Sequence, residues 1–556
     1  MKATDIKALL RFIGIMLVAE GALMALCLVP AFHFADGTQD PIGLCSAFTL
    51  TVGAMLWVSF GSYRRIEDRR MSYLLVVLMW LVLTLFATLP FLVTGATAAS
   101  SLAPFTAAWF ESMSGLTSCG ATVFPNVASL PSSLLLWRSM MQWFGGFGIV
   151  LLVLAISPKL GINKYSLYTA EASGADNTGK TAVSTGATLR RTLSVYLALT
   201  LFFVLMLNLA GMQMWDAVNL TFTNISSGGF SLASDSIASC TPLQQYILAL
   251  AMLLGGVNFM LLYLFFTLRW KQIGRKLEQF GFYMGLFLAA VLFVVAALHW
   301  HMQLPWQVAL RIGVVQTASA LTTTGSLVAD TSVWWTPLCF LLLMLSLCGG
   351  MAGSTSGGLK AMRVLILLRN ARGILRGRLH PNAVSPLRLN GRPVSTHIVN
   401  NVMVIFMVFG FTLLLGTMGL MLCGIDATQS IGASVGCLTG FGPGLGASGG
   451  FGSYDAFSPL ALWLCSFLML LGRLECMTVL VLFLPRFWRR EPRRLSVPAP
   501  YPLRLFTGCL TVFGRRGVGG GTEWVGMGVV RKKIVGNVFF CIFASLTDSL
   551  IQKPNT

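Results

Sequence analysis

The sequence predicts an all-α integral membrane protein with four pseudo-symmetric span–pore-helix–span repeats around one pore, preceded by two extra transmembrane helices. Three observations lead to this fold class. Of the 556 residues, 55% are hydrophobic and only 10% are charged, whereas soluble domains average about 25% charged residues. Many segments reach the roughly 20 apolar residues that one spanning helix needs. A polar turn that contains glycine also recurs about every 100 residues between apolar segments.

Two apolar spans come first, at 9–34 and 43–61, joined by a short loop. The first run is too long for the apolar core of a signal peptide and shows no clear small-residue cleavage site. We therefore expect it to remain in the protein as a transmembrane helix.

Each of the four repeats reads as an apolar span, a shorter apolar piece, a polar glycine turn and a second long span. A helix rises 1.5 Å per residue, so the short pieces at 103–117, 216–225, 306–321 and 426–437 cannot cross a bilayer. We expect re-entrant half-helices there, with Asp216 and Asp426 as N-caps. The predicted boundaries are 1–70 for the two N-terminal helices, 71–160, 190–276, 279–372 and 394–490 for pore repeats 1 to 4, and 491–556 for a poorly ordered cytoplasmic C-terminal extension.

The four turns carry the chemistry that we expect to matter. Non-helical polar backbone survives in a bilayer only where protein buries it or where it lines a water-filled cavity. Rings of backbone carbonyls can replace the water shell of a cation such as K⁺, glycine permits the required backbone angles, and the C-terminal end of each half-helix favours a cation. Ordinary interhelical loops are the alternative. The candidate filter residues are Ser118, Cys119 and Gly120; Ser226, Ser227 and Gly228; Thr323, Thr324 and Gly325; and Gly440, Phe441 and Gly442.

The net charge of +20 follows the membrane topology. Lys and Arg gather in alternate loops, and because positive loops stay on the cytoplasmic side, both ends of the core are predicted to be cytoplasmic. We therefore expect the lipid bilayer, and no nucleic acid, as the partner of this basic chain.

A glycine-rich run interrupts the last span of the third repeat. Each glycine in a helix interior costs about 1 kcal/mol relative to alanine, so we expect the helix to unwind locally at 349–358. One interpretation of this run is a flexible intramembrane loop that blocks the pore. Close helix packing through small residues is the alternative, and a phosphate-binding loop is disfavoured because no strand precedes the run. The candidate gate residues are Gly349, Gly350, Gly353, Gly357, Gly358, Lys360 and Arg473.

Charged residues inside membrane segments are usually functional. For Arg473 the interpretations are an electrostatic barrier in the permeation path, or an ion pair to Glu475 or snorkelling to the membrane surface. For Glu111, Arg138 and Arg311 we favour structural ion pairs behind the filter over direct ion handling.

Residues 1 to about 490 resemble the Trk/Ktr/HKT superfamily of potassium transporters, specifically the bacterial Trk-type membrane subunit. Besides the turns, the resemblance rests on FESMSG at 110–115, WRSMMQWFGGFG at 137–148, GGMAGSTSGGLK at 349–360 and GRLE at 472–475. It implies one filter glycine per repeat, here Gly120, Gly228, Gly325 and Gly442. It also favours the pore-blocking loop at 349–358, and it implies that Arg473 faces the pore and contacts this loop, so we predict that Arg473 is an electrostatic barrier. Cys119 and the pair Gly440–Phe441 depart from the family pattern.

The resemblance also implies K⁺ as the transported ion, no covalently bound cofactor, and nucleotide only through a partner. It implies a homodimer in the cytoplasmic (inner) membrane of a bacterium, gated by a cytosolic ring of nucleotide-binding regulatory subunits. A Na⁺- or H⁺-coupled secondary cation transporter with weaker K⁺ selectivity is the alternative function. An intramembrane enzyme is disfavoured because the acids Glu20, Glu111 and Glu475 and the five histidines show no catalytic or metal spacing.

Overall fold

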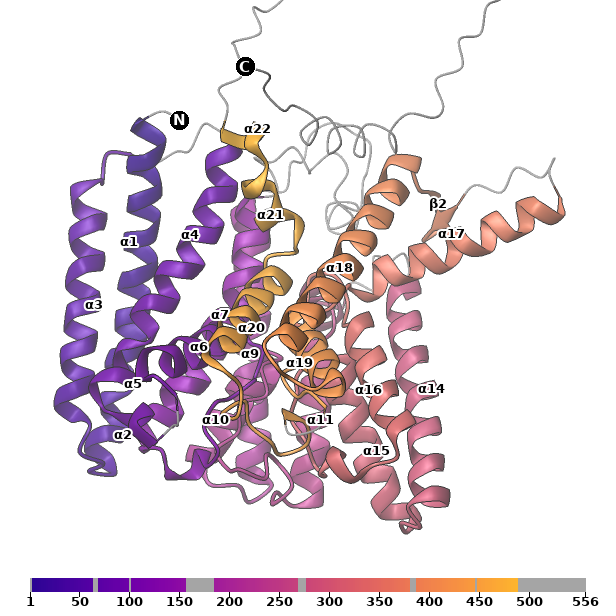
Figure 1. Cartoon of the computed structure of the whole chain (residues 1–556), viewed down its shortest axis with the longest axis horizontal. Helices are drawn as coiled ribbons and strands as arrows, with labels where there is room; N and C mark the ends of the chain where they lie inside the picture. The colour runs from indigo at the N-terminus through magenta and orange to yellow at the C-terminus, as the bar shows by residue number, and fades with distance from the viewer. Residues whose placement is uncertain are drawn as a thin grey trace, which may run out of the picture. The chain divides into compact units, whose positions relative to one another are not determined.

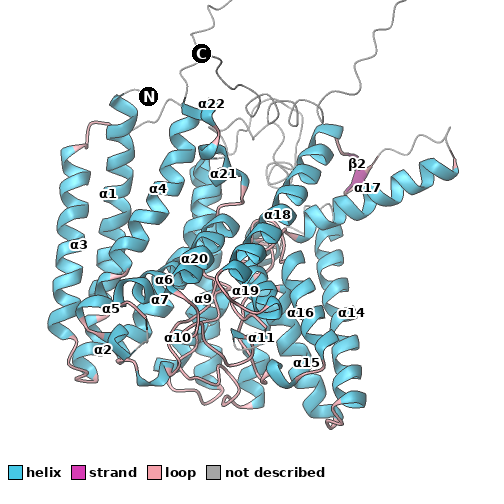
Figure 2. Ribbon diagram, viewed as in Figure 1, coloured by secondary structure: helices cyan, strands magenta, loops and turns pink. Residues whose placement is uncertain are grey.

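The computed structural model describes residues 3–63, 69–99, 102–156, 185–268, 277–380, 387–445 and 448–488. This part of the chain is almost entirely helical, as the sequence predicts, with one short hairpin of β1 (Arg388–Leu389) and β2 (Arg392–Pro393) (Figure 2). The predicted extension at 491–556 lies outside the described residues.

Three N-terminal helices precede the first repeat: α1 (Ala3–Leu26), α2 (Leu28–His33) and α3 (Gln39–Ser59). The predicted first span corresponds to α1 and α2 together, which form one candidate membrane span, Thr4–His33, with a break at Cys27. Small residues hold α1 against α3, because a Cβ on Gly14 or on Gly53 would lie 2.7 Å from a backbone nitrogen of the other helix. This is the close backbone approach that glycine permits between membrane helices.

The loop before α3 is tied to a later helix through Asp36. Its carboxylate accepts hydrogen bonds from the Thr38 hydroxyl (2.6 Å) and from the Ser133 backbone N–H (3.0 Å). Partial burial alone would raise the pKa of Asp36, but these donors stabilise the ionised form and bring its pKa below the usual value.

Four helical units follow (Figure 1). The first contains α4 (Arg69–Ala87), α5 (Leu89–Val93), η1 (Ala96–Ala99), α6 (Pro104–Leu116), η2 (Val127–Ser129) and α7 (Ser132–Ile156). The second contains α9 (Thr185–Leu209), α10 (Met214–Ile225), α11 (Pro242–Gly255) and α12 (Phe259–Phe266). The third contains α14 (Leu277–His301), α15 (Trp306–Leu321), η4 (Thr331–Val333), α16 (Thr336–Cys348) and α17 (Ala361–Leu379). The fourth contains α18 (Thr396–Leu422), α19 (Ala427–Thr439), α20 (Pro459–Arg473), α21 (Met477–Leu480), η6 (Val481–Phe483) and α22 (Pro485–Trp488).

The contacts among these helices follow one cyclic order. Inside each unit the short helix (α6, α10, α15 or α19) packs against the long helix before it and the helix after it. Between units, α7 packs on α10, α11 on α15, α16 on α19, and α20 returns to α6. The four short helices are thus brought together from segments far apart in the sequence.

The helices that follow the turns differ in continuity. In the second unit α11 and α12 are bent by 106°, and in the fourth unit α20 and the α21–η6 segment are bent by 105°. The segments predicted as long spans at 243–268 and 457–488 are therefore each broken by a bend instead of forming one straight helix. In the second unit the Asn258 side chain caps the start of α12 by accepting hydrogen bonds from Met260 and Leu261 N–H. In the fourth unit Glu475 has a left-handed φ of 56°, which is incompatible with continuing α20. In the third unit the glycine run is non-helical, as predicted, between Cys348 and Ala361.

The two predicted N-caps have different outcomes. Asp426 caps α19, because its carboxylate accepts a hydrogen bond from Thr428 N–H at 3.0 Å. The N-cap prediction for Asp216 is wrong: α10 starts at Met214 after Gln213, so Asp216 lies inside the first turn. An acidic residue still suits this position because the helix N-terminus carries partial positive charge.

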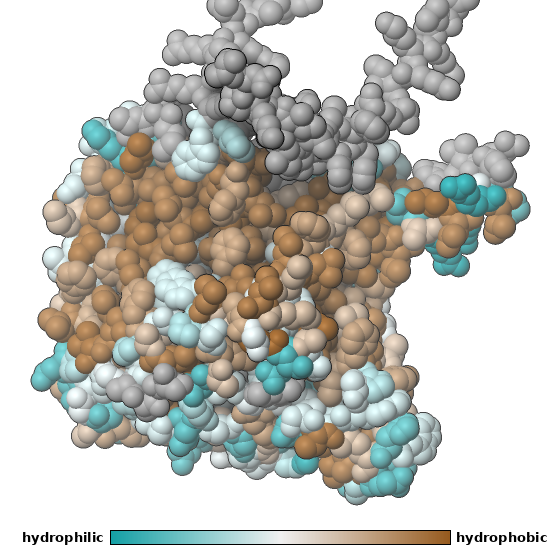
Figure 3. All heavy atoms as spheres, viewed as in Figure 1, coloured by the Kyte–Doolittle hydropathy of each residue, from teal (hydrophilic) through white to brown (hydrophobic). Residues whose placement is uncertain are grey.

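The surface agrees with a multi-pass membrane protein. Among the described helices, six are long and apolar enough to cross a bilayer, and the number rises to eight when each bent pair is counted as one span. Figure 3 shows a broad apolar band over the visible face, with hydrophilic residues gathered below it.

Candidate functional site: four turns and a loop

Each short helix ends in a turn with the same backbone path. The second residue beyond each of α6, α10 and α15, and the first beyond α19, has a left-handed φ: Ser118 (48°), Ser227 (56°), Thr323 (54°) and Gly440 (74°). A glycine with left-handed φ stands two residues later: Gly120 (85°), Gly229 (72°), Gly325 (84°) and Gly442 (86°). The residue between these two positions donates its backbone N–H to the carbonyl oxygen five residues earlier. The N···O distances are 2.8–2.9 Å, and the four donors are Cys119, Gly228, Thr324 and Phe441.

This shared geometry shifts the second turn by one residue from the sequence prediction. Gly229 has the conformation of Gly120, Gly325 and Gly442, whereas Gly228 occupies the place of Cys119. Two adjacent glycines leave the register of this turn ambiguous in the sequence. The serine before them marks the better register, because Ser227 corresponds to Ser118 in backbone angle.

The four glycines also connect neighbouring turns. A Cβ on Gly120 would lie 2.1 Å from the Gly228 carbonyl oxygen, and one on Gly229 would lie 1.9 Å from the Thr324 oxygen. The same contact continues from Gly325 to the Phe441 oxygen (2.1 Å) and from Gly442 to the Cys119 oxygen (2.5 Å). The contacts run from the first turn to the second, third and fourth and back to the first. No side chain fits at these positions, so the carbonyls of adjacent turns come together around a closed ring.

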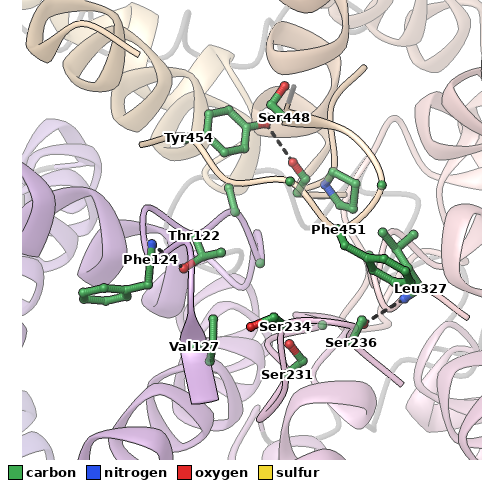
Figure 4. A pocket seen from close by; sticks show the side chains of 18 of the residues that line it. Thr122, Phe124, Val127, Ser231, Ser234, Ser236, Leu327, Ser448, Phe451 and Tyr454 are labelled. Atoms are coloured by element: carbon green, nitrogen blue, oxygen red, sulfur yellow. Dashed lines mark hydrogen bonds between the residues drawn. The ribbon is translucent and has the colours of Figure 1, made fainter. Parts of the chain in front are cut away.

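A pocket opens on one side of this ring. Gly120, Gly229, Gly325 and Gly442 all line it, together with hydroxyl-bearing side chains such as Thr122, Ser231 and Ser448 (Figure 4). None of the described residues that line the pocket carries a charge. Tyr454 reaches into the wall and donates a hydrogen bond from its hydroxyl to the Gly442 carbonyl oxygen at 2.8 Å.

A buried ion pair joins the first two turns behind the ring. Arg138 Nε lies 2.7 Å from Glu111 Oε1, and both side chains are buried. Glu111 also accepts from Val123 N–H (3.1 Å), while Arg138 donates to the Ser231 carbonyl oxygen (3.0 Å). The prediction that Glu111 and Arg138 take part in a structural ion pair is confirmed, and the structure shows that they pair with each other. Arg311 forms no such pair with a described residue, and its Nε is buried without a hydrogen-bond partner.

The glycine-rich loop, residues 349–360, contacts three of the four turns. Gly357 N–H donates to the Thr323 hydroxyl (2.6 Å) and Gly358 N–H to the Thr439 carbonyl oxygen (3.0 Å). The Thr355 hydroxyl lies 2.9 Å from the Ser227 hydroxyl. The loop contacts the first residues of each of these turns, next to the end of the short helix. The glycines that line the pocket follow two or three residues later in the chain. The loop therefore lies on the other side of the ring from the pocket.

Thr355 ties the loop further to the second unit, although the sequence analysis did not single it out. Its hydroxyl lies 2.9 Å from the Ile225 carbonyl oxygen and 3.1 Å from the Gly255 carbonyl oxygen. A threonine between two serines gives no local sequence signal for these contacts, whose partners are the last residues of α10 and α11.

Arg473 holds the loop from the fourth unit. Its guanidinium donates to the Thr355 carbonyl oxygen (2.9 Å) and to the Gly145 carbonyl oxygen in α7 (3.0 Å). The alternative pairing of Arg473 with Glu475 is wrong, because Glu475 pairs with Arg363 at 2.8 Å. Lys360 donates to the Ser356 carbonyl oxygen within the loop. Two cations thus lie at or beside the loop below the ring.

The comparisons with known proteins agree with this architecture. The family model described as "TrkH: Cation transport protein" matches residues 39–490. The Trk system potassium uptake protein TrkH of Escherichia coli (strain K12) is 32% identical over 485 residues, which cover 87% of this chain and 99% of that protein. TrkH of Halomonas elongata is 32% identical over 497 residues, covering 87% of this chain and all of that protein.

A solved structure is also similar. The crystal structure of the potassium transporter TrkH from Vibrio parahaemolyticus matches with a TM-score of 0.78 and 30% identity, covering 87% of this chain and 100% of that chain. The family match spans most of the chain, so the chain belongs to the TrkH family of cation transport proteins.

Proposed function

We propose that this protein takes up potassium ions across the cytoplasmic membrane of a bacterium through one pathway framed by the four turns. The observation that carries the proposal is the closed ring of contacts from Gly120 through Gly229, Gly325 and Gly442. Four units that present equivalent backbone around one axis supply what a cation needs in place of its water shell. The names of the relatives indicate which cation this is.

The filter in this proposal consists of the predicted residues of the four turns, with Gly229 added to the second. The side chains at the place of Cys119 vary among the turns: they are a thiol, no side chain at Gly228, a hydroxyl at Thr324 and an aromatic ring at Phe441. The backbone path is the same in all four. Selection therefore depends on backbone carbonyls, and the neutral pocket on one side supplies hydroxyl groups through which a hydrated ion can approach.

Gating is assigned to residues 349–360. A loop that bonds to Ser227, Thr323 and Thr439 crosses beneath the ring and obstructs an ion that leaves it. Gly349 and Gly358 have left-handed φ values of 67° and 70°, so the segment forms a folded loop and not a helix. Arg473 adds a positive charge at the same level, which opposes a cation.

The remaining assignments follow from the family and the charge pattern. Both ends of the core lie in the cytoplasm, because the Lys- and Arg-rich loops stay on that side. The protein works as a homodimer, and a cytosolic ring of nucleotide-binding subunits controls the loop from the basic inner surface. Potassium is the transported ion and not a resident cofactor.

Flux measurements in proteoliposomes test this function. The purified protein is reconstituted, and uptake of K⁺ and of Na⁺ is measured for the wild type, for Gly325→Ser and for Gly285→Ser. Gly325→Ser is expected to reduce the K⁺ preference, because the added Cβ would meet the Phe441 carbonyl oxygen at 2.1 Å. Gly285 lies in α14 with open space around it, so the same substitution there should leave flux unchanged.

Equal K⁺ and Na⁺ flux through the wild type would refute potassium selection. Repeating the K⁺ measurement with imposed Na⁺ or H⁺ gradients separates channel-like flux from coupled transport. K⁺ uptake that requires one of these gradients would favour the secondary-transporter alternative.

A further inference from the structure

One polar side chain from the first unit is built into the second turn. Gln142, in α7, is fully buried. Its Nε2 donates to the Gly228 carbonyl oxygen at 2.9 Å, and its Oε1 accepts from the Phe230 backbone N–H at 3.0 Å. The amide therefore uses both its donor and its acceptor on the two residues that flank Gly229.

The carbonyl that Gln142 contacts belongs to the ring. The Gly228 oxygen is the atom that a Cβ on Gly120 would approach to 2.1 Å. Gln142 thus bonds to an oxygen at the junction of the first and second turns, and it does so from behind the backbone of the second turn. A hydrogen-bonded amide at this place limits the movement of that oxygen.

The same amide explains why the second turn contains two glycines. Gly228 does not have a left-handed φ, so its backbone conformation does not require glycine. A Cβ at Gly228 would instead meet Gln142 Cδ at 2.4 Å, Oε1 at 2.5 Å and Nε2 at 2.8 Å. The equivalent positions in the other turns are Cys119, Thr324 and Phe441, which all carry side chains. The space for a side chain at this place in the second turn is occupied by Gln142.

Gly229 needs to be glycine for a different reason. Its φ is 72°, and its Cβ would lie 1.9 Å from the backbone oxygen of Thr324. Backbone cannot move aside as a side-chain tip can, so no change at Gln142 relieves this contact. The two glycines therefore respond differently to the removal of Gln142.

We propose that Gln142 is a positioning residue that fixes the second wall of the filter and thereby contributes to ion selectivity, and that Gly228 is glycine to admit it. This inference rests on the proposed filter. Gln142→Met keeps the size of the side chain but removes the donor and the acceptor. The loss of the donor and the acceptor should lower the K⁺/Na⁺ permeability ratio by about tenfold, which corresponds to about 1.4 kcal/mol.

The decisive experiment compares Gly228→Ala in two backgrounds. The K⁺/Na⁺ permeability ratio and the K⁺ uptake rate are measured in proteoliposomes for the wild type, Gly228→Ala, Gln142→Ala and the double variant. In the wild-type background Gly228→Ala should reduce the ratio by about tenfold, because the added methyl group fits only if the buried Gln142 amide gives up its two hydrogen bonds. In the Gln142→Ala background the same substitution should change the ratio less than about twofold, because the space is then free.

Gly229→Ala in both backgrounds is the matched control, and it should be equally damaging in each. Monodispersity and melting temperature in detergent provide a second readout, with the same pattern expected if Gly228→Ala impairs folding. A Gly228→Ala defect of equal size in both backgrounds would overturn the inference. A wild type that does not distinguish K⁺ from Na⁺ would refute the filter itself, which is a separate result.

Discussion

Arg473→Met is expected to raise potassium flux in the absence of any partner subunit. The guanidinium donates to the Thr355 and Gly145 carbonyl oxygens, and so links the loop to α20 and α7. Hydrogen bonds from a charged donor contribute about 1.5–3 kcal/mol each. Water can replace part of these hydrogen bonds when the loop moves, so the substitution should destabilise the closed state by about 2 kcal/mol. That change raises the population of the open state about 30-fold. Methionine keeps much of the volume while removing the charge and the donors.

Potassium uptake into proteoliposomes measures this effect directly, with protein content and melting temperature determined in parallel. Arg363→Gln is the matched control, because it removes a nearby arginine whose partner, Glu475, has a side chain that is 48% exposed. Ion pairs of this kind contribute little, so basal flux should stay at the wild-type level. A correctly folded Arg473→Met protein with wild-type flux would refute the assignment of Arg473 to the closed state.

Three further substitutions test the surroundings of the ring. Glu111→Gln leaves Arg138 buried without its anionic partner, and breaking a buried ion pair costs about 3–5 kcal/mol. The melting temperature in detergent should therefore fall strongly, and an unchanged melting temperature would contradict the pairing. Tyr454→Phe removes the donor to the Gly442 carbonyl oxygen, so the K⁺/Na⁺ permeability ratio should fall while the melting temperature changes little. An unaltered ratio would show that this carbonyl needs no support. Asp36→Asn should destabilise the protein near pH 7 but not in acid. The folded-state pKa of Asp36 lies below its usual value of 3.8, so its contribution is complete above that value and is lost as the pH falls through the folded-state pKa. Melting temperatures at several pH values measure this, and a pH-independent difference would argue against it.

The sequence by itself determined the helical class, the four short helices and the position of the polar turns. The apolar lengths leave few alternatives, because a segment such as 306–321 is too short to cross a bilayer and yet too apolar for water. The break in the helix at 349–358 could also be predicted from the sequence, since so many glycines destabilise a helix in any environment. These features depend on local composition and length.

Tertiary structure decided which groups meet. The sequence does not tell why both Gly228 and Gly229 are glycine. Only the contacts with Thr324 and Gln142 show that Gly229 is required by its backbone and Gly228 by a neighbouring side chain. Arg473 could have paired with Glu475 two residues away, but the turn at Glu475 directs that carboxylate to Arg363 and leaves Arg473 to the loop. Such partners come from units far apart in the sequence, and the packing that brings them together has no local signature.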